Sequence, residues 1–190
     1  MPESIAAFGE DSAHRHVVGA LIRRVAAELD IQVALEWRRA RGGHGRVAAE
    51  VEEYLRDIKR QGDWPGLVVI ATDANCFGPA GRARQIPTAS SPVPVVLAIP
   101  DPHIERWLLL DGKAFRKVLG QGCKPPDQKC ARDRYKEALI RAVEDAGVAP
   151  ALGGIEFAEE IVEAMDLRRA ARSDPSLKRF LRDLRRALKK

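Results

Sequence analysis

Long apolar runs are missing from this sequence of 190 residues. A helix that crosses a bilayer needs about 20 mostly apolar residues in a row, and no such run is present. Residues Met1 to Glu10 also lack the basic start, apolar stretch and small-residue cleavage site of a secretory signal. We therefore expect a cytoplasmic protein without a membrane partner.

Cysteine is scarce as well, with three residues at Cys76, Cys123 and Cys130. Their number is odd and no two have the Cys-x-x-Cys spacing, which disfavours both a disulfide framework and a zinc knuckle. The sequence thus predicts three reduced thiols.

Motifs of several large enzyme classes are also absent. The chain has no Gly-x-x-x-x-Gly-Lys-Ser/Thr phosphate loop, no Gly-x-Gly-x-x-Gly after the first predicted strand, no Gly-x-Ser-x-Gly elbow and no His-Glu-x-x-His. These absences disfavour nucleotide hydrolysis, dinucleotide-dependent redox chemistry and serine hydrolysis.

What the sequence does contain is enough apolar surface for one core, since 45% of the residues are hydrophobic and 31% are charged. Apolar segments with strand character alternate with segments of helical periodicity. The predicted strands are residues 4–9, 31–37, 66–72 and 93–99. The first predicted helix carries the apolar positions between residues 17 and 29, and another helix starts at residue 104. The other main predicted helices are residues 46–60, 132–146, 155–165 and 175–188. Asp174 and Pro175 match the cap and first position of the last helix.

This alternation predicts an α/β fold with a mostly parallel sheet of about four strands flanked by helices. We expect residues 1–125 to form the α/β core and residues 126–190 to form a helical C-terminal extension packed on it, within one domain.

Carboxylates and one amide follow three of the four predicted strands. Glu10 follows the first strand, Asp73 and Asn75 follow the third, and Asp101 and Glu105 follow the fourth. Ligands of open α/β sheets bind outside the carboxyl ends of the strands. Like charges gathered there repel one another, and a divalent cation, best Mg²⁺ and alternatively Mn²⁺, would make the cluster favourable. Because a strand-end acid lies outside the apolar core, replacing Asp73 is expected to leave the fold intact.

Three segments carry a resemblance to a known family: Phe8-Gly9-Glu10-Asp11, residues 69–75 (Val-Ile-Ala-Thr-Asp-Ala-Asn) and residues 99–109 (Ile-Pro-Asp-Pro-His-Ile-Glu-Arg-Trp-Leu-Leu). They resemble the Toprim motifs of bacterial defence-associated proteins, similar to the RloB-like proteins and, more distantly, to the overcoming-lysogenization-defect nucleases. The resemblance covers about residues 5–111 and implies a Toprim-like, Rossmann-like fold.

The resemblance also implies roles for individual residues. Glu10 and Asp73 would hold Mg²⁺ for phosphodiester cleavage or transfer, and Glu105 would match an extra glutamate that precedes a tryptophan in such proteins. Lys136 stands where related proteins place a lysine that could offset charge near a phosphate. The second aspartate of the family's Asp-x-Asp is Asn75 here, which can coordinate through its amide oxygen but brings no charge.

Structural interpretations of the same residues remain open. Glu10 can simply favour a helix N-terminus, and Glu105 can serve as a first-turn acid of the helix that carries Trp107. Asp101 is expected to cap that helix, and Asp111 to face solvent. Among the histidines, His103 and, less so, His14 lie near enough to the proposed site to take part.

Basic residues are concentrated at the end of the chain. Residues 168–190 hold ten basic and two acidic side chains in a chain whose net charge is +5, so the rest of the sequence is mildly acidic. This asymmetry favours a polyanionic partner, and a solvated helix face is the alternative. The expected nucleic-acid contacts are Arg82 and Arg84, in a loop after Asp73, and Arg182, Arg185 and Arg186 on the last helix.

The sequence therefore predicts a magnesium-dependent nuclease or related phosphotransferase that acts on nucleic acid, with phage defence as its setting. Its predicted catalytic residues are Glu10, Asp73, Glu105 and Lys136, and its predicted metal ligands are Glu10, Asp73, Asn75 and Glu105. The alternative is a catalytically impaired Toprim-like module that binds nucleic acid or a protein partner of a defence system.

Overall fold

A four-stranded parallel sheet forms the centre of the computed structural model, which describes residues 3–39, 44–62, 64–89, 91–124, 127–131 and 133–189. The strand order is β2-β1-β3-β4. The strands are β1 (Glu3–Gly9), β2 (Val33–Arg39), β3 (Leu67–Ala71) and β4 (Val95–Ala98), and each neighbouring pair is parallel. The predicted α/β class with a sheet of four parallel strands is confirmed.

Helices connect the strands and make up the rest of the described chain. The first three are α1 (Ser12–Glu28), α2 (His44–Gln61) and α3 (Gly78–Ala83), the last preceded by the 3-10 turn η1 (Asn75–Phe77). After β4 come α4 (Glu105–Leu108), α5 (Gly112–Leu119), α6 (Arg134–Asp145), the 3-10 turn η2 (Ile155–Phe157), α7 (Ala158–Ala164), α8 (Leu167–Ser173) and α9 (Pro175–Leu188).

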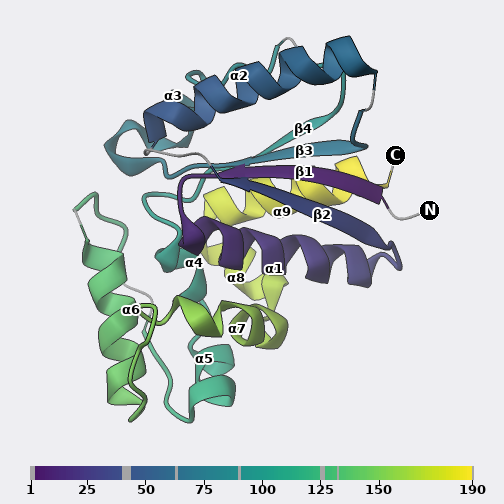
Figure 1. Ribbon diagram of the computed structural model, residues 1–190. Helices are drawn as coiled ribbons and strands as arrows, with labels where there is room; N and C mark the ends of the chain where they lie inside the picture. The colour runs from purple at the N-terminus through teal and green to yellow at the C-terminus, as the bar shows by residue number, and fades with distance from the viewer. Residues whose placement is uncertain are drawn as a thin grey trace.

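The apolar pattern of each central strand explains its place in the sheet. All five residues of β3 are buried, as expected for a strand covered on both faces. Alternate side chains of β1 and β3 enter two hydrophobic clusters: Ile5 and Val69 join the cluster on the side of α1 and α9, whereas Phe8 and Ile70 join the cluster on the side of α2. Figure 1 shows the resulting layers, with α2 and α3 above the sheet and α1 and α9 below it.

Helix α9 completes the lower layer. Asp174 caps its N-terminus by accepting a hydrogen bond from the backbone N–H of Leu177 at 2.8 Å, and Pro175 occupies the first turn, as predicted. The helix also has a buried apolar stripe, which consists of Leu177, Phe180, Leu181, Leu184 and Leu188. This stripe packs against β4 and α1, so the end of the chain covers the same face of the sheet as α1.

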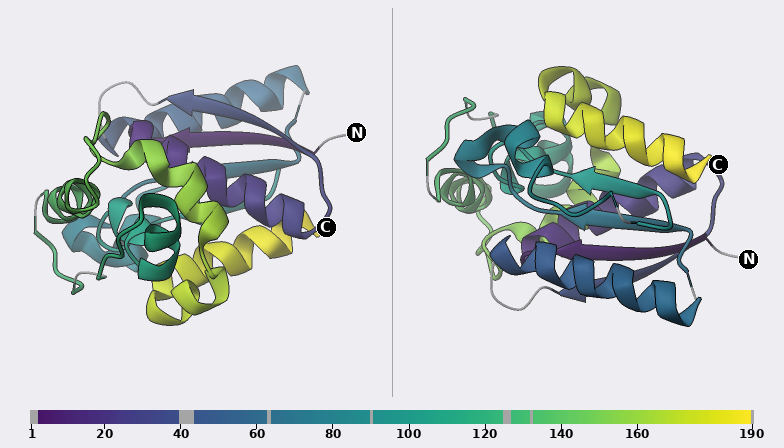
Figure 2. Two further views of the ribbon diagram at one scale, coloured as in Figure 1. Left: turned by 90° about the horizontal axis from the view of Figure 1, so that it is seen from below. Right: turned by 90° about the horizontal axis from the view of Figure 1, so that it is seen from above.

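The strands run from right to left in Figure 1, and their carboxyl ends meet beside α6. The two views of Figure 2 show α4 to α7 gathered at this end, with α9 running back toward the other. Among the residues that the structure describes, no helix is long and apolar enough to cross a membrane.

Two expectations about individual acids were wrong. Asp101 does not cap α4, whose first turn is preceded by Ile104; its carboxylate instead accepts a hydrogen bond from Gln128 at 2.7 Å. Asp111 does not face solvent, because only 2% of it is exposed and it caps α5. Both of its carboxylate oxygens also accept hydrogen bonds from Arg169 of α8, which fixes the α5 cap to the helical end of the chain.

Candidate active site

A pocket of about 300 Å³ lies at the carboxyl edge of the sheet. Its acidic and basic lining residues are Asp11, Asp73, His103, Glu105, Asp133 and Lys136. They come from the start of α1, the end of β3, the connection between β4 and α4, and the start of α6. Segments far apart in the sequence thus build one site at the sheet edge where α/β proteins bind ligands.

The carboxylate of Asp73 is bonded to three other residues. Its Oδ1 accepts hydrogen bonds from the backbone N–H of Ile104 at 2.9 Å and from Nε2 of His14 at 3.2 Å, and its Oδ2 lies 3.1 Å from Nδ1 of His103. Burial alone would raise the pKa of Asp73, but the charge of His14 and the hydrogen bonds from both histidines lower it to about 2. Asp73 is therefore an anion at neutral pH.

His14 lies inside the protein between two carboxylates. Its ring is fully buried, with Nε2 facing Asp73 and Nδ1 2.8 Å from Oδ1 of Asp11. Burial opposes a charge, but the neighbouring Asp73 charge and the bond to Asp11 raise the pKa of His14 well above 6.5. The doubly protonated ring satisfies both partners, so Asp11, His14, Asp73 and His103 form one continuous hydrogen-bonded chain.

Glu10 joins the ends of β1 and β3. Its Oε1 accepts a hydrogen bond from the hydroxyl of the buried Thr72 and another from the backbone N–H of Asp73 at 3.3 Å. The N-cap of α1 is Asp11, which accepts from the backbone N–H of His14 at 3.1 Å. Glu10 thus positions the backbone of Asp73 and is not the cap of α1.

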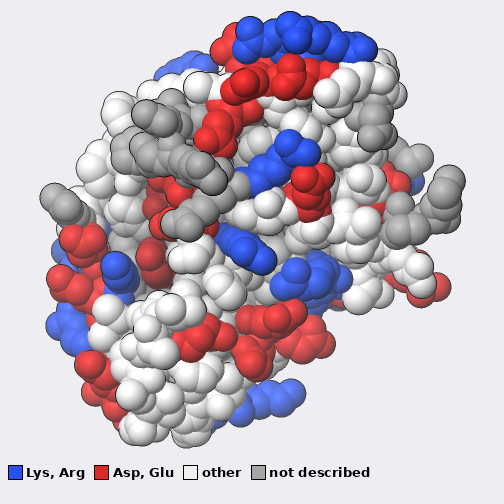
Figure 3. Space-filling model, in the orientation of Figure 1, with Lys and Arg blue, Asp and Glu red and all other residues white. Residues whose placement is uncertain are grey.

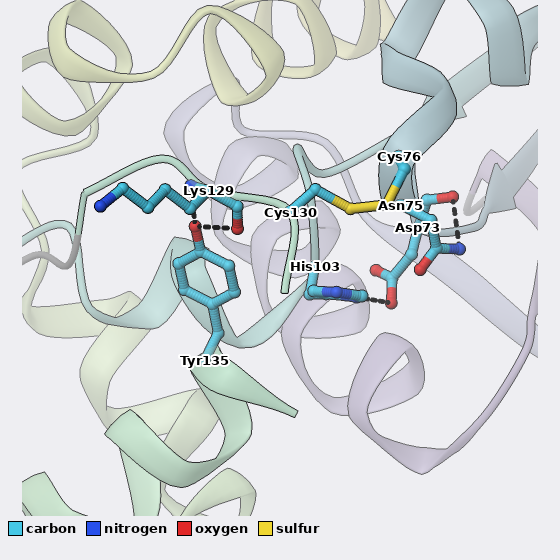
Figure 4. Close-up of a disulfide and its surroundings, with 7 residues drawn as sticks. All are labelled: Asp73, Asn75, Cys76, His103, Lys129, Cys130 and Tyr135. Atoms are coloured by element: carbon cyan, nitrogen blue, oxygen red, sulfur yellow. Dashed lines mark hydrogen bonds and ion pairs between the residues drawn. A yellow bond between two sulfur atoms is a disulfide. The ribbon is translucent and has the colours of Figure 1, made fainter. Parts of the chain in front are cut away.

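Asn75 and Arg82 both hold the carbonyl group of Asp73. The amide Nδ2 of Asn75 lies 3.5 Å from that oxygen, and Figure 4 shows Asn75 turned back toward Asp73. Nε of Arg82 donates to the same oxygen at 2.8 Å, and its NH1 donates to Gln85. Arg82 does not lie in an open loop as expected: it is 6% exposed and belongs to α3, whereas Arg84 at the end of α3 is exposed.

Glu105 and Lys136 approach the pocket from α4 and α6. The pKa of Glu105 is raised, first by burial and then by the charge of Asp73. Asp11 adds to the same repulsion. Burial alone would raise the pKa of Asp11, but its hydrogen bonds to His14 and the charge of that ring lower it. Three carboxylates thus repel one another at the mouth of the pocket, and Lys136 is a cation that lines it with them.

The donor set allows a test of the expected magnesium site. The described residues contain no group of three or more His, Cys, Asp or Glu side chains arranged to hold a metal ion. Mg²⁺, however, commonly binds through one or two carboxylates, with water and substrate phosphate completing its shell. Asp73 and Glu105 line the pocket together, and one lone-pair direction of Asp73 Oδ2 remains beside the bond to His103. The oxygen chemistry of these two residues fits Mg²⁺.

Apart from Arg84, which is exposed at the end of α3, the residues predicted from the sequence fall into three groups in the structure. Asp73, Glu105 and Lys136 meet in the pocket, and Glu10, Asn75 and Arg82 lie directly behind Asp73 without lining it. Arg182, Arg185 and Arg186 lie on α9, away from the pocket-lining residues; Arg185 bonds Glu28 at the end of α1, and the other two bond Asp183.

Some residues of the site were underestimated or missed. His14 and Asp11 are central to the hydrogen-bonded chain, and the side chain of Tyr135 lines the pocket wall. The prediction of three reduced thiols was wrong, because a disulfide joins Cys76 and Cys130. Asp11 and His14 lie three residues apart at a helix start, and this spacing could have indicated their contact. A disulfide between cysteines 54 residues apart leaves no local pattern in the sequence.

Comparison of the chain with protein-family models, with curated proteins and with solved structures found no match. The class of the protein therefore rests on its own fold and site. It is an α/β protein with a parallel sheet and an acidic pocket at the carboxyl edge of that sheet.

Proposed function

We propose that this protein is a magnesium-dependent nuclease or related phosphotransferase acting on nucleic acid. The observation that carries the proposal is the convergence of Asp11, Asp73 and Glu105 in one pocket with His103 and Lys136. The resemblance of its strand-end segments to Toprim motifs supports the same reaction class.

Asp73 and Glu105 would hold the cation, and Glu10 and Asn75 would keep Asp73 in place. When bound, Mg²⁺ supplies Lewis-acid activation of the phosphate and of an attacking water. The bonds from His14 and His103 fix the direction of the Asp73 carboxylate, which lines the pocket.

His103 is placed to move a proton. Its Nδ1 faces Asp73, which leaves Nε2 on the other side of the ring, and the residue lines the pocket. The bond to Asp73, opposed by partial burial, raises the pKa of His103 and favours its protonated form. We assign it the role of general acid, which gives a proton from Nε2 to the oxygen that leaves phosphorus as the ester bond breaks. The ammonium group of Lys136 would offset charge on the phosphate.

The nucleic-acid part of the proposal is supported by charge. Arg182 and Arg186 are exposed along α9, together with Lys178 and Arg179. The face drawn in Figure 3 differs from the α9 surface. Basic and acidic side chains are mixed on this face, and the basic row over α2 has acidic groups directly below it. Helix α9 lies toward the back of that view, as Figure 2 shows from above.

A direct test is cleavage of supercoiled plasmid, single-stranded DNA and RNA with Mg²⁺, Mn²⁺ or EDTA. We expect cleavage that EDTA abolishes and that Glu105→Gln lowers at least about a hundredfold, since a carboxylate at the reacting centre is lost. Glu52→Gln, an exposed acid on α2, is the matched control and should cleave normally. Equal cleavage rates in the Glu105 variant and the wild type would show that the pocket does not take part in the reaction.

A non-catalytic binding module is the second candidate, and one feature favours it. Asn75 stands where the resemblance expects a second acid, and Asp73 is already held by two histidines. Such a module would bind nucleic acid with equal affinity in Mg²⁺ and EDTA and would cleave none of the substrates. Binding of that kind, with a melting temperature indifferent to Mg²⁺, would replace the first proposal with this one.

A further inference from the structure

The disulfide between Cys76 and Cys130 spans the edge of the candidate active site. Cys76 lies in η1, three residues after Asp73, and Cys130 lies six residues before Lys136. The two Cα atoms are 5.5 Å apart, and both residues are exposed to solvent. Figure 4 shows the bond between the Asp73 side of the site and the segment that leads to Tyr135.

The flank that carries Cys76 is held by backbone bonds. The N–H of Ala74 donates to the carbonyl oxygen of Pro100 at 2.9 Å, and the N–H of Asn75 donates to that of Pro102 at 3.0 Å. Arg82 holds the carbonyl oxygen of Asp73 from the other side. This flank therefore keeps its position without help from the disulfide.

The flank that carries Cys130 is held mainly by side chains. Residues 127–131 are exposed and contain no helix or strand. The N–H of Lys129 donates to the hydroxyl oxygen of the buried Tyr135 at 2.7 Å, and that hydroxyl lies 2.8 Å from the carbonyl oxygen of Asp127. Gln128 adds a bond to Asp101. Arg134 also pairs with Asp127 and donates from its backbone N–H to Ala131, so most of these bonds tie the segment to α6. The disulfide is the covalent link that fixes the segment to the sheet edge.

We propose that Cys76 and Cys130 form a reversible thiol–disulfide exchange site that sets the position of the pocket wall formed by the start of α6. In the oxidised protein the wall that carries Tyr135 and Lys136 is fixed against the Asp73 side; in the reduced protein residues 127–131 and 133–136 move away from it. The effect on catalysis rests on the proposed function, whereas the exchange and the movement do not.

The co-reactant is a small disulfide such as glutathione disulfide. The thiolate of one cysteine attacks it, forming a mixed disulfide and releasing one glutathione thiolate. The thiolate of the second cysteine then attacks the protein sulfur of that mixed disulfide and releases the second glutathione. Two protein thiols are oxidised to one disulfide, one glutathione disulfide is reduced to two thiols, and the two thiol protons pass to the two released glutathiones.

Cys123 provides a matched control in the same chain. It is partly buried, its sulfur lies 3.7 Å from the carbonyl oxygen of Leu109, and burial raises the pKa of its thiol to about 11. A thiol that stays protonated at neutral pH exchanges slowly. Cys123→Ser should therefore leave the exchange unchanged.

The experiment compares the full chain after equilibration with glutathione disulfide and after reduction with dithiothreitol and removal of the reductant. Titration of thiols in denaturant should find one thiol in the oxidised protein and three in the reduced protein. Hydrogen exchange followed by mass spectrometry should show exchange in residues 127–136 faster by about tenfold or more after reduction. Peptides of α9 should not change.

Three comparisons separate the outcomes. Cys76→Ser and Cys130→Ser should show the fast exchange under both conditions, and Cys123→Ser should behave as the wild type. Where cleavage is found, reduction should lower its kcat/KM at least about tenfold, since small displacements at a site are costly. Three thiols after oxidation, or equal hydrogen exchange in both states, would overturn the proposed thiol–disulfide exchange site. A protein that cleaves none of the substrates would overturn only the proposed function.

Discussion

Asp73 holds both a structural and a chemical position, and a substitution there affects the two together. Its carboxylate accepts bonds from Ile104, His14 and His103. We predict that Asp73→Ala lowers the free energy of unfolding by about 1–3 kcal/mol, because it leaves the buried His14 without one of its partners. Urea unfolding measures this loss. Unchanged stability would show that the fold does not need Asp73, as expected from its position at the end of a strand.

Asn75 lies directly behind Asp73 and can be changed to an acid of nearly the same shape. Its Nδ2 donates toward the carbonyl oxygen of Asp73, and its φ of 47° is a left-handed conformation that aspartate also tolerates. Asn75→Asp replaces that donor with a charge, so we predict a lower melting temperature in EDTA and a larger rise on adding Mg²⁺ than in the wild type. Calorimetry of Mg²⁺ binding tests the same point. Weaker binding in the variant would show that position 75 does not face the cation.

Asp111 gives the clearest pH signature outside the pocket. Burial alone would raise the pKa of Asp111. The hydrogen bonds from the side chain of Arg169 and from the backbone N–H groups of Asp166 and Ala114 instead lower this pKa below 3.8. Its stabilising contribution is therefore present above pH 3.8 and is lost as the pH falls below that value. We predict that Asp111→Asn costs about 1–3 kcal/mol at neutral pH.

The cost of Asp111→Asn should shrink as the pH falls below 3.8, which urea unfolding at a series of pH values measures. The control is Asp145→Asn, which removes an exposed acid at the end of α6. A cost that stays constant with pH would mean that the charge of Asp111 contributes nothing.

At the scale of elements, helices and strands were predicted best where the apolar pattern agreed with residues that mark the end of an element. The bounds of α9 were predicted from Asp174, Pro175 and helical periodicity, and β3 was predicted from the strand character of its apolar segment. Helices α3, α5 and α8 were not predicted, because they have six to eight residues and too few turns to show a period. Helix α5 nevertheless carries two end signals, the cap Asp111 and the left-handed Gly120.

The basic row of α9 can be tested as one unit. Arg182 and Arg186 bond Asp183, and Arg185 bonds Glu28, all at the surface. We predict that changing the three arginines to Gln weakens binding to all nucleic-acid sequences alike and flattens the salt dependence by about one unit of slope per lost phosphate contact. Stability should change little, since exposed ion pairs contribute little to folding.

The matched control for α9 removes three exposed cations from α2, namely Arg56, Lys59 and Arg60. Binding is measured by fluorescence anisotropy at several salt concentrations. Equal losses in both triple variants would show that net charge alone matters, and no loss in the α9 variant would show that its row is a solvated face.

At the scale of the whole molecule, the candidate site was predictable only in part. The carboxyl ends of parallel strands meet at one edge, so Asp73 and Glu105 could be placed together from strand positions alone. The partners of His14 and the disulfide across 54 residues depend on how α1, α6 and the loops pack, which no local pattern encodes. The pairing of Asp111 with Arg169 was missed for the same reason.

The packing of α9 decides whether residues 1–125 can fold alone. Trp107 stacks on Phe180 with ring centroids 5.6 Å apart and donates from its indole N–H to Ser176 at 3.0 Å, so the core side of α4 is closed by α9. Removing residues 126–190 would uncover this tryptophan and the face of the sheet that Leu177 and Leu181 cover.

Each large apolar side chain of α9 contributes about 1.5–3 kcal/mol by burial, so losing five of them matches the whole stability of a typical domain, about 5–15 kcal/mol. We predict that a fragment of residues 1–125 shows no cooperative thermal transition and binds a hydrophobic dye, whereas the full chain unfolds in one transition. Circular dichroism in the far and near ultraviolet measures both. A sharp transition with native near-ultraviolet signal in the fragment would show that the α/β core is independent, and that α6 to α9 are an addition the sheet does not need.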